Sequence, residues 1–329
     1  MTKNRPKVAL ILRSRTKDFF SLEKVFGILN KLLDTQLLVL PYQSNKVVRL
    51  LKNIYFFRAL NADILHISGH DHYLLWLPKR KTILTIHDIE ALNRKRGLRK
   101  WIFKKLWFDI PLSNASVVTT ISEFTKSELL LLGNYKAPIK VIYNPITIDL
   151  DYSPKPLLSK KPRVLHLGTK KNKNLPRLLK AIEGLDIELV IIGNLSKDLQ
   201  FQIKKSKSLI VVKKSLSDDE LVKEYEACDI LSFISTYEGF GLPIIEAQSI
   251  GRVVLTSNVA SMPEVAGEGA YFVDPYSVED IRKGIEELIK NDSLRKELVE
   301  KGRENVKRFE PKKIAAQYQE LYDQVANEA

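Results

Sequence analysis

Two glutamates flank a glycine turn in the second half of the chain. Glu238 and Glu246 have seven residues between them, Gly-Phe-Gly-Leu-Pro-Ile-Ile, and an apolar run precedes the turn. A strand that breaks into such a turn and opens a helix leaves backbone N–H groups that suit a phosphate. Carboxylates repel a phosphate, so we expect these two to accept hydrogen bonds from sugar hydroxyls. A structural turn with surface glutamates is the alternative.

The elements that position this turn are short apolar runs, which we expect to be strands, and amphipathic segments, which we expect to be helices. The two kinds alternate along the chain. Such alternation predicts α/β folding with parallel sheets, and its repetition predicts two Rossmann-like domains whose sites lie beyond the carboxyl ends of the strands. The predicted strands are Val8–Leu12, Gln36–Leu40, Asp63–Ser68, Thr82–Ile86, Ser116–Ile121 and Lys140–Tyr143, then Arg163–Leu167, Ile187–Ile192, Leu209–Val212, Asp229–Ser235, Val253–Thr256 and Tyr271–Val273.

Length and linker composition divide the chain. A chain of 329 residues exceeds one usual core, and residues 144–156 contain three prolines. We predict a first domain over residues 1–150, a second over 151–309 and a C-terminal helix over 310–329.

The positive charge is confined to the first domain. Residues 1–150 hold 25 Lys and Arg against 11 Asp and Glu, whereas residues 151–329 hold 28 of each, so the net charge of +14 belongs to the first half. This asymmetry indicates a partner with negative charge. Nucleic acid is suggested by charge alone, and no basic-groove motif supports it. The single cysteine, Cys228, and the absence of a long apolar stretch predict a cytoplasmic protein.

The motif around the two glutamates resembles that of a known family. Glu-Gly-Phe-Gly-Leu-Pro-x-x-Glu-Ala is similar to the Glu-x7-Glu signature of the retaining GT-B glycosyltransferases called GT4. The resemblance implies a GT-B fold, with two domains facing each other across a cleft and a last helix that crosses back to the first domain.

The resemblance also implies a nucleotide-sugar site. Lys173 matches the family's diphosphate-binding lysine, while Thr169 stands where an arginine is often found, so that Lys170 or Lys171 would replace its charge. His87 would face the anomeric centre and share the catalytic role with Glu238; Glu246 would bind the ribose. The implied donor-binding residues are Gly168, Thr169, Lys170, Lys173, Lys213, Glu238, Gly239, Phe240, Gly241, Leu242 and Glu246.

The acceptor side departs from the family. GT4 proteins carry a glycine-rich turn after the first strand, whereas this chain has no glycine before Gly27. We assign the acceptor side to Arg13, Arg15, Lys17, His70 and Asp88. The three cations suit an anionic acceptor, and a solvated basic loop is the alternative. Histidines at 66, 70 and 72 raise the question of a metal, but we expect no metal and no cofactor beyond the nucleotide-sugar co-substrate.

Two basic, aromatic segments lie in the first domain, at residues 46–58 and 94–108. In the second, Leu98, Trp101, Ile102 and Leu106 share a helical face. Basic helices with tryptophans fit an anionic membrane surface. Sheet-covering helices with solvated lysines are the alternative.

The resemblance, taken with these observations, implies a retaining, metal-independent hexosyltransferase in cell-surface polysaccharide synthesis. Its donor would be a nucleotide sugar and its acceptor a glycan or lipid-linked sugar, with peripheral membrane contact and no nucleic acid. A sugar-nucleotide epimerase of the same fold and a non-catalytic glycan-synthesis subunit are the alternatives.

Overall fold

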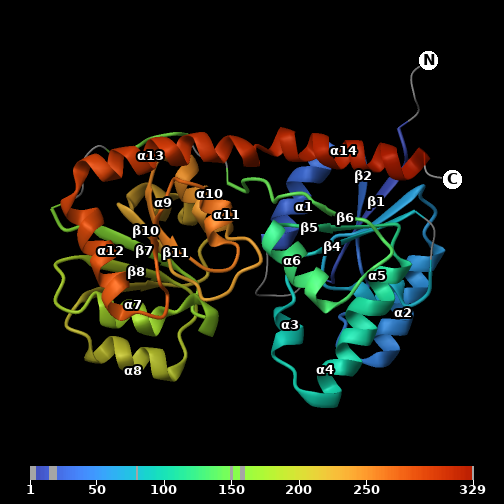
Figure 1. The fold of residues 1–329 in the computed structure, drawn as a ribbon, viewed down its shortest axis with the longest axis horizontal. Coiled ribbons are helices and arrows are strands. Elements are labelled where there is room, and N and C mark those ends of the chain that lie inside the picture. The colour runs from blue at the N-terminus through green and yellow to red at the C-terminus, as the bar shows by residue number, and fades with distance from the viewer. Residues whose placement is uncertain (1–4, 15–20, 79–80, 149–150, 156–159, 328–329) are drawn as a thin grey trace. The chain divides into compact units, whose positions relative to one another are not determined.

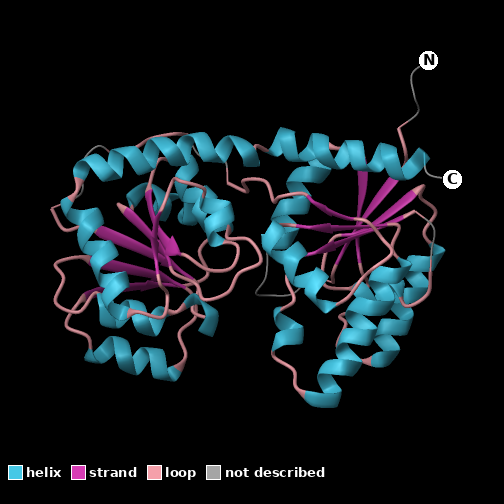
Figure 2. Cartoon of the chain, in the orientation of Figure 1, coloured by secondary structure: helices cyan, strands magenta, loops and turns pink. Residues whose placement is uncertain are grey.

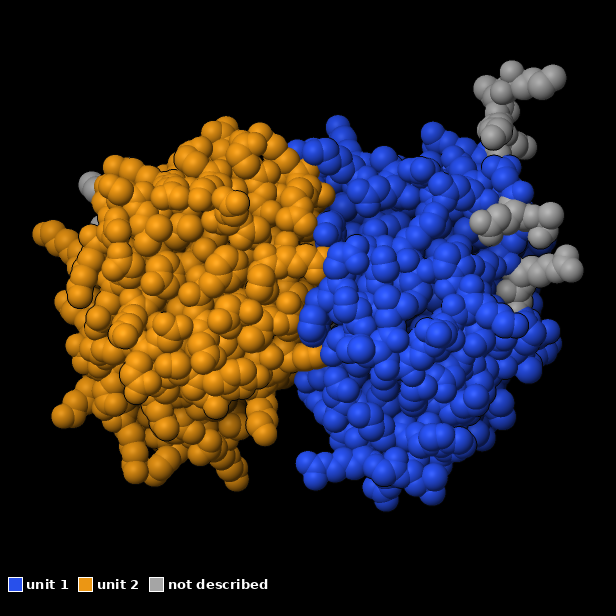
Figure 3. Space-filling view, viewed as in Figure 1, with its two compact units in different colours: residues 1–147, 310–329 blue, residues 148–309 orange. Residues whose placement is uncertain are grey.

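The structure is a computed structural model that describes residues 5–14, 21–78, 81–148, 151–155 and 160–327 (Figure 1). The chain forms two compact units (Figure 3). Unit 1 comprises Met1–Thr147 and Glu310–Ala329, and unit 2 comprises Ile148–Phe309.

Unit 1 is built on a parallel sheet of six strands. Its order is β2-β1-β3-β4-β5-β6, with bounds Thr35–Val39, Val8–Leu12, Ile64–Ile67, Thr82–Ile86, Val117–Thr120 and Ile139–Val141. Its central strands are buried along their whole length and mostly apolar, as expected for strands covered by helices on both faces.

Unit 2 repeats this plan with a second parallel sheet. The order is β12-β11-β10-β7-β8-β9, with bounds Tyr271–Val273, Val253–Ser257, Ile230–Phe233, Arg163–Leu167, Glu188–Ile192 and Leu209–Lys213. The predicted α/β class with two parallel sheets is therefore confirmed, and strand ends differ from the predicted ones by two residues at most.

Helices pack around each sheet (Figure 2). Those of unit 1 are α1 Ser21–Leu32, α2 Val47–Ala59, α3 Glu90–Asn93, α4 Gly97–Lys104, α5 Ile110–Asn114, α6 Glu123–Leu132 and α14 Pro311–Asn327, with η1 at His72–Leu75 and η2 at Lys105–Asp109. Those of unit 2 are α7 Leu175–Ala181, α8 Lys197–Lys205, α9 Asp218–Ala227, α10 Leu242–Ser249, α11 Met262–Ala266, α12 Val278–Lys290 and α13 Asp292–Val306, with η3 at Lys171–Lys173 and η4 at Lys307–Phe309.

The helix α14 completes unit 1. Tyr322 of α14 contacts His66 of β3 through a hydrogen bond of 2.8 Å between its hydroxyl and Nδ1. Lys81 donates to the carbonyl of Ala326. The last helix therefore packs on the first domain, as the resemblance implied.

The second basic segment does not keep one helical period. α4 ends at Lys104, and a π-helical stretch, η2, follows. The change of period turns Leu106 away from the face that the other three residues share. Leu106 is half-buried, whereas Leu98, Trp101 and Ile102 are exposed. The prediction that all four share a face is therefore wrong at Leu106.

Among the described residues, each helix is too short or too polar to span a bilayer.

Candidate active site

Two loops meet at the carboxyl edge of the unit 2 sheet. The N–H of Gly168 donates to Ile192, and that of Gly193 donates to Lys213, so the loops after β7 and β8 extend the sheet. Gly168 has a φ of +91°, and a Cβ there would lie 3.0 Å from the side chain of Lys173. A glycine is therefore needed here both for the backbone conformation and for the lysine that lies across the turn.

Lys173 and Glu238 come together at this edge. Lys173 Nζ lies 2.7 Å from Glu238 Oε1, and both side chains are mostly buried. The same ammonium group lies 4.4 Å from the centre of the Phe233 ring. The structure thus brings a predicted phosphate-binding cation and a predicted hydroxyl acceptor into direct contact, although 64 residues separate them in the sequence.

Asn172 links the loop after β7 to the loop after β10. Its Nδ2 donates to Glu238 Oε1 at 3.0 Å and to the carbonyl of Tyr237 at 2.9 Å. The N–H of Thr236 returns a bond to the carbonyl of Asn172. Sequence reasoning missed this residue, since an asparagine within a lysine run reads as an ordinary loop residue.

The backbone of the glycine turn is stabilised by the side chain of Ser261. Ser261 Oγ lies 2.9 Å from the carbonyl oxygen of Glu238 and 2.6 Å from that of Phe240. The Phe240 ring is buried against Phe309, so only the backbone of this residue can serve a ligand at the edge. Gly241 has a φ of +121° and precedes α10, whose N-terminus therefore starts at the turn. Ser261 is a further residue that the motif did not reveal.

Glu246 is buried near the middle of α10. It is 6% exposed, and its Oε2 accepts from the hydroxyl of Tyr225 at 2.6 Å. Burial, followed by the charge of Glu246, raises the pKa of Tyr225 far above its ordinary range, so this phenol stays a donor. Tyr225 therefore orients the carboxylate that the resemblance assigns to the ribose.

The other predicted donor contacts have partners of their own. Lys213 forms an ion pair with Glu224, which also pairs with Arg163. Thr169 donates its hydroxyl to the carbonyl of Asn194, and Lys170 is exposed. Lys213 is thus already held by a carboxylate, so its assignment to the donor stays a prediction.

The carboxyl edge of the unit 1 sheet gathers histidines. His87 follows β4, and its Nε2 lies 2.8 Å from the carbonyl oxygen of Ser68, which can only accept; Nε2 therefore carries the proton. The His70 ring lies 5.8 Å from that of His87. Burial first, then the nearby His70, lowers the pKa of His87 to about 4, so its ring is neutral at pH 7.

Asp88 steadies the loop beside His87. Its Oδ1 accepts from the N–H of Glu90, where α3 begins. Asp71, which sequence reasoning passed over, lies in the loop after β3 and is buried with its carboxylate against Ser44. Burial is the largest cause of a raised pKa at Asp71.

Arg13 is paired within unit 1. Its guanidinium makes two bonds to Glu23, of 2.8 and 3.1 Å. The pairing compensates much of the positive charge that we expected at this position. Arg15 and Lys17, the other cations of the predicted acceptor side, lie outside the described residues.

The described residues contain no group of three or more His, Cys, Asp or Glu side chains arranged to hold a metal. The expectation of metal independence includes the absence of an Asp-x-Asp motif, which can hold a divalent ion, and that point is wrong: the linker carries Asp149-Leu150-Asp151. The first two of these residues lie outside the described part, and Asp151 is exposed.

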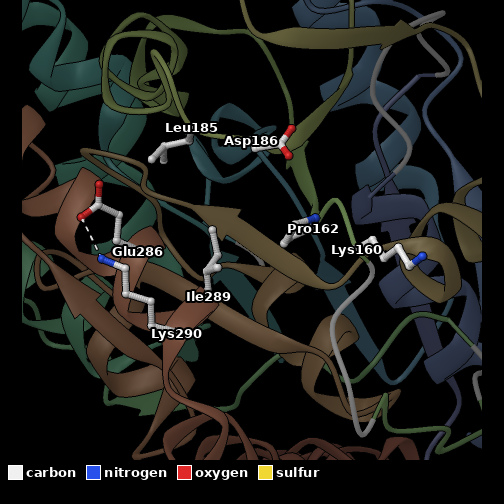
Figure 4. Close-up of a pocket in the computed structure, with 7 residues that line it drawn as sticks. All are labelled: Lys160, Pro162, Leu185, Asp186, Glu286, Ile289 and Lys290. Atoms are coloured by element: carbon white, nitrogen blue, oxygen red, sulfur yellow. Dashed lines mark ion pairs between the residues drawn. The ribbon is translucent and has the colours of Figure 1, made fainter.

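Unit 2 also contains a pocket of about 400 Å³ that is lined by none of the candidate site residues (Figure 4). Its lining includes Pro162, Leu185 and Asp186, which precede β7 and β8, together with Ile289 of α12. These residues lie at the amino ends of the strands, opposite the Gly168 turn. The pocket therefore does not belong to the candidate site.

Comparisons with known proteins identify the family of the chain. Residues 151–305 match the family model "Glycosyl transferases group 1", and residues 7–150 match "Glycosyltransferase Family 4". The O-antigen chain mannosyltransferase B of Escherichia coli is 30% identical over 71% of this chain and 68% of its own length. The serotype-specific mannosyltransferase WbdA of Escherichia coli is 27% identical over 72% of this chain, which spans 34% of that relative.

Solved structures show the same fold at low identity. HepE of Anabaena, solved with UDP-glucose, has a TM-score of 0.79 at 15% identity and covers 97% of this chain and 100% of its own. A glycosyltransferase of Rickettsia africae has a TM-score of 0.72 at 19% identity and covers 99% of this chain and 100% of its own. With two family models, a relative at 30% identity and two parallel sheets that match these structures, the chain belongs to the GT-B glycosyltransferases of group 1, the GT4 type.

Proposed function

We propose that this protein transfers a hexose-type sugar from a nucleotide-sugar donor to a glycan or lipid-linked acceptor, with retention, in cell-surface polysaccharide synthesis. The contact between Lys173 and Glu238 carries the proposal. A phosphate needs the cation and a sugar hydroxyl needs the carboxylate, and the two groups lie side by side at the edge where such sheets bind ligands. The mannosyltransferase relatives and a neighbour solved with UDP-glucose support a sugar-nucleotide donor.

The donor would lie along the carboxyl edge of unit 2. Its diphosphate would take the place of Glu238 at the Lys173 ammonium and accept from the first N–H groups of α10 and of the Gly239–Gly241 turn. Glu238 would then turn to the hydroxyls of the sugar, and Glu246, oriented by Tyr225, would bind the ribose.

Catalysis would consist mainly of electrostatic stabilisation. Negative charge grows on the leaving diphosphate in the transition state, and preorganised donors such as Lys173 and the helix N-terminus stabilise it there. We propose front-face attack with the leaving phosphate as the base, which requires neither a side-chain nucleophile nor a metal. The neutral ring of His87 would contact the sugar from unit 1 when the two units close on the donor.

The acceptor is proposed to be an uncharged glycan hydroxyl. Glu23 already compensates Arg13, while His70, Asp88 and Asp71 supply hydrogen-bonding groups in the loops after β3 and β4. These groups suit hydroxyls better than they suit an anion.

We also propose that the protein is cytoplasmic and works at the inner face of a membrane. The excess charge of residues 1–150 would draw it to anionic lipids, where a lipid-linked acceptor is presented.

Replacing Glu238 tests the enzymatic proposal. UDP-, GDP-, ADP- and dTDP-sugars are first compared by thermal shift, because a tightly bound donor raises the melting temperature. With the donor so found, Glu238→Ala should reduce sugar transfer by about 100-fold or more, the usual effect of removing one preorganised group. The nucleoside diphosphate should still raise the melting temperature of the variant, because Lys173 and α10 remain.

Glu268→Ala is the matched control, because Glu268 is an exposed glutamate of the same unit. Full transfer by Glu238→Ala would overturn the site. An epimerase would alter the donor sugar without an acceptor, and a non-catalytic subunit would bind the donor without turnover. The assay is run with a chelator, and transfer that appears only after a divalent ion is added would contradict metal independence.

A further inference from the structure

The helix α4 turns its apolar side to solvent. Leu98 and Trp101 are 71% and 64% exposed, Ile102 is exposed as well, and their spacing places them on one face. The helix has no buried residue, and Phe103 packs toward the core by stacking on Trp107 at 5.0 Å. The alternative that α4 merely covers the sheet therefore does not hold.

The helix α2 has an apolar outer face too. Its inner face buries Leu50, Asn53, Ile54 and Phe57. On the opposite face Val48, Leu51 and Tyr55 recur at helical spacing, and Tyr55 is 79% exposed. The helix α2 is thus apolar on its outer side as well as on its inner side.

The two helices are joined through η1. Tyr73 of η1 accepts a bond from Asn53 of α2, and its ring lies 6.1 Å from that of Trp107 in η2, which continues α4. Both helices lie along the lower margin of unit 1 in Figure 1. We call their exposed apolar residues the α2–α4 surface: Val47, Val48, Leu51, Tyr55, Leu98, Trp101 and Ile102.

Cations outnumber carboxylates beside this surface, although Arg94 is paired with Glu90 and Lys104 with Asp109. Residues 46–58 contain four Lys and Arg and residues 94–108 contain seven, which makes eleven, and neither segment contains Asp or Glu. Beside Val47 and Val48, a cavity of about 420 Å³ is lined by Lys46, Arg49, Lys52 and Tyr42. Such a cavity suits a phosphate group.

We propose that the α2–α4 surface docks on an anionic lipid bilayer, with its apolar side chains among the headgroups and the bordering cations on lipid phosphates. Apolar side chains with a tryptophan and surrounding lysines are the chemistry of an interfacial helix. The inference rests on the proposed membrane association and goes beyond it, because it names the surface and adds apolar insertion to electrostatic attraction.

Sedimentation with vesicles tests the surface. The full chain is incubated with vesicles of phosphatidylcholine alone, or with mixed vesicles that contain phosphatidylcholine and the anionic lipid phosphatidylglycerol. The native protein should bind the mixed vesicles at low salt and lose part of that binding at high salt, because salt screens only the charge contribution. The double variant Leu98→Ser/Trp101→Ser should bind about tenfold less or weaker still, as expected when two large apolar side chains no longer insert.

Leu131→Ser is the matched control, because Leu131 is 87% exposed on α6 of the same unit. It should bind like the native protein. The tryptophan emission should shift to the blue on binding, and Trp101→Phe should bind with a much smaller shift.

The outcomes separate the claims. If the native protein fails to bind mixed vesicles at low salt, the membrane association itself is wrong. If it binds and the double variant binds equally, only the assignment of the α2–α4 surface is wrong. Disruption of a dimer by the double variant, seen in gel filtration, would make this surface an interface between copies and overturn the inference. Transfer to a soluble acceptor should be unchanged in all these variants, so failure of the enzymatic proposal is seen independently.

Discussion

The ammonium group of Lys173 has a carboxylate partner before any ligand arrives. Glu238 lies 2.7 Å away, and Asn172 holds that carboxylate from its other side. A cation kept beside an anion in this way stays extended across the Gly168 turn instead of moving freely in solvent. The proposed diphosphate would exchange one anionic partner for another, so little rearrangement of the lysine is required.

Lys173→Gln should weaken binding of the nucleoside diphosphate by about tenfold or more, because a charge-assisted hydrogen bond contributes about 1.5–3 kcal/mol. The measurement is the dissociation constant by calorimetry. Lys180→Gln serves as the control, since Lys180 is an exposed lysine of α7 in the same unit. Equal losses in both variants would show that the general positive charge matters and that the position of Lys173 does not.

The sequence predicted the types of residue at this site better than their partners. Glycine turns and a lysine after the first strand of the second domain are local patterns, and the structure places Gly168, Lys173 and Glu238 at one edge. The pairing of Lys213 with Glu224 and the bond from Tyr225 to Glu246 depend on how separate helices and strands pack. Sequence spacing carries no such information.

At the scale of elements, the turn before α10 depends on one backbone conformation. Gly241 has a φ of +121°, and a Cβ there would lie 3.1 Å from Ile244. Gly241→Ala should therefore lower the free energy of unfolding by about 1–3 kcal/mol and weaken donor binding, because the N-terminus of α10 would shift. Urea unfolding and thermal shift with donor measure the two effects.

Gly27→Ala is the matched control. Gly27 lies inside α1 with nothing within 4 Å of its added Cβ, so the substitution should stabilise unit 1 by about 0.5–1 kcal/mol. If Gly241→Ala left both stability and donor binding unchanged, the turn would not need this conformation.

Element type was predictable where the pattern was strong. Strands buried on both faces read as continuous apolar runs, and they were found within two residues. The end of α4 at Lys104 was not predictable, because a π-helical stretch changes the period without any proline or glycine to mark it. Which apolar residues point outward depends on that change.

At the scale of the whole molecule, buried histidines should make stability depend on pH. Burial is the main cause that lowers the pKa of His66 and His72 to about 3 and of His87 and His166 to about 4. In the unfolded chain they take up protons near pH 6.5. Between about pH 6.5 and 4 the unfolded state therefore binds more protons, and folding stability falls as the pH falls.

The expected slope is about 1.4 kcal/mol per pH unit for each histidine within that window. Urea unfolding from pH 7 to 4.5 measures it, with the signals of the two units analysed separately. The raised pKa of Asp71 works in the opposite direction, because its folded form keeps a proton that the unfolded form loses. Stability that stays constant between pH 6.5 and 4.5 would contradict the burial of these rings.

The return of α14 to unit 1 has a consequence for the order in which the protein is made. The last strand of the unit 1 sheet, β6, ends at Val141. His66 of that sheet, however, can form its hydrogen bond to Tyr322 only after the ribosome has synthesised all of unit 2. Unit 2 is continuous in sequence and can close as soon as its last residue emerges. The domain that is synthesised first is therefore finished last, and until then the nascent chain exposes the apolar surface on which α14 will lie.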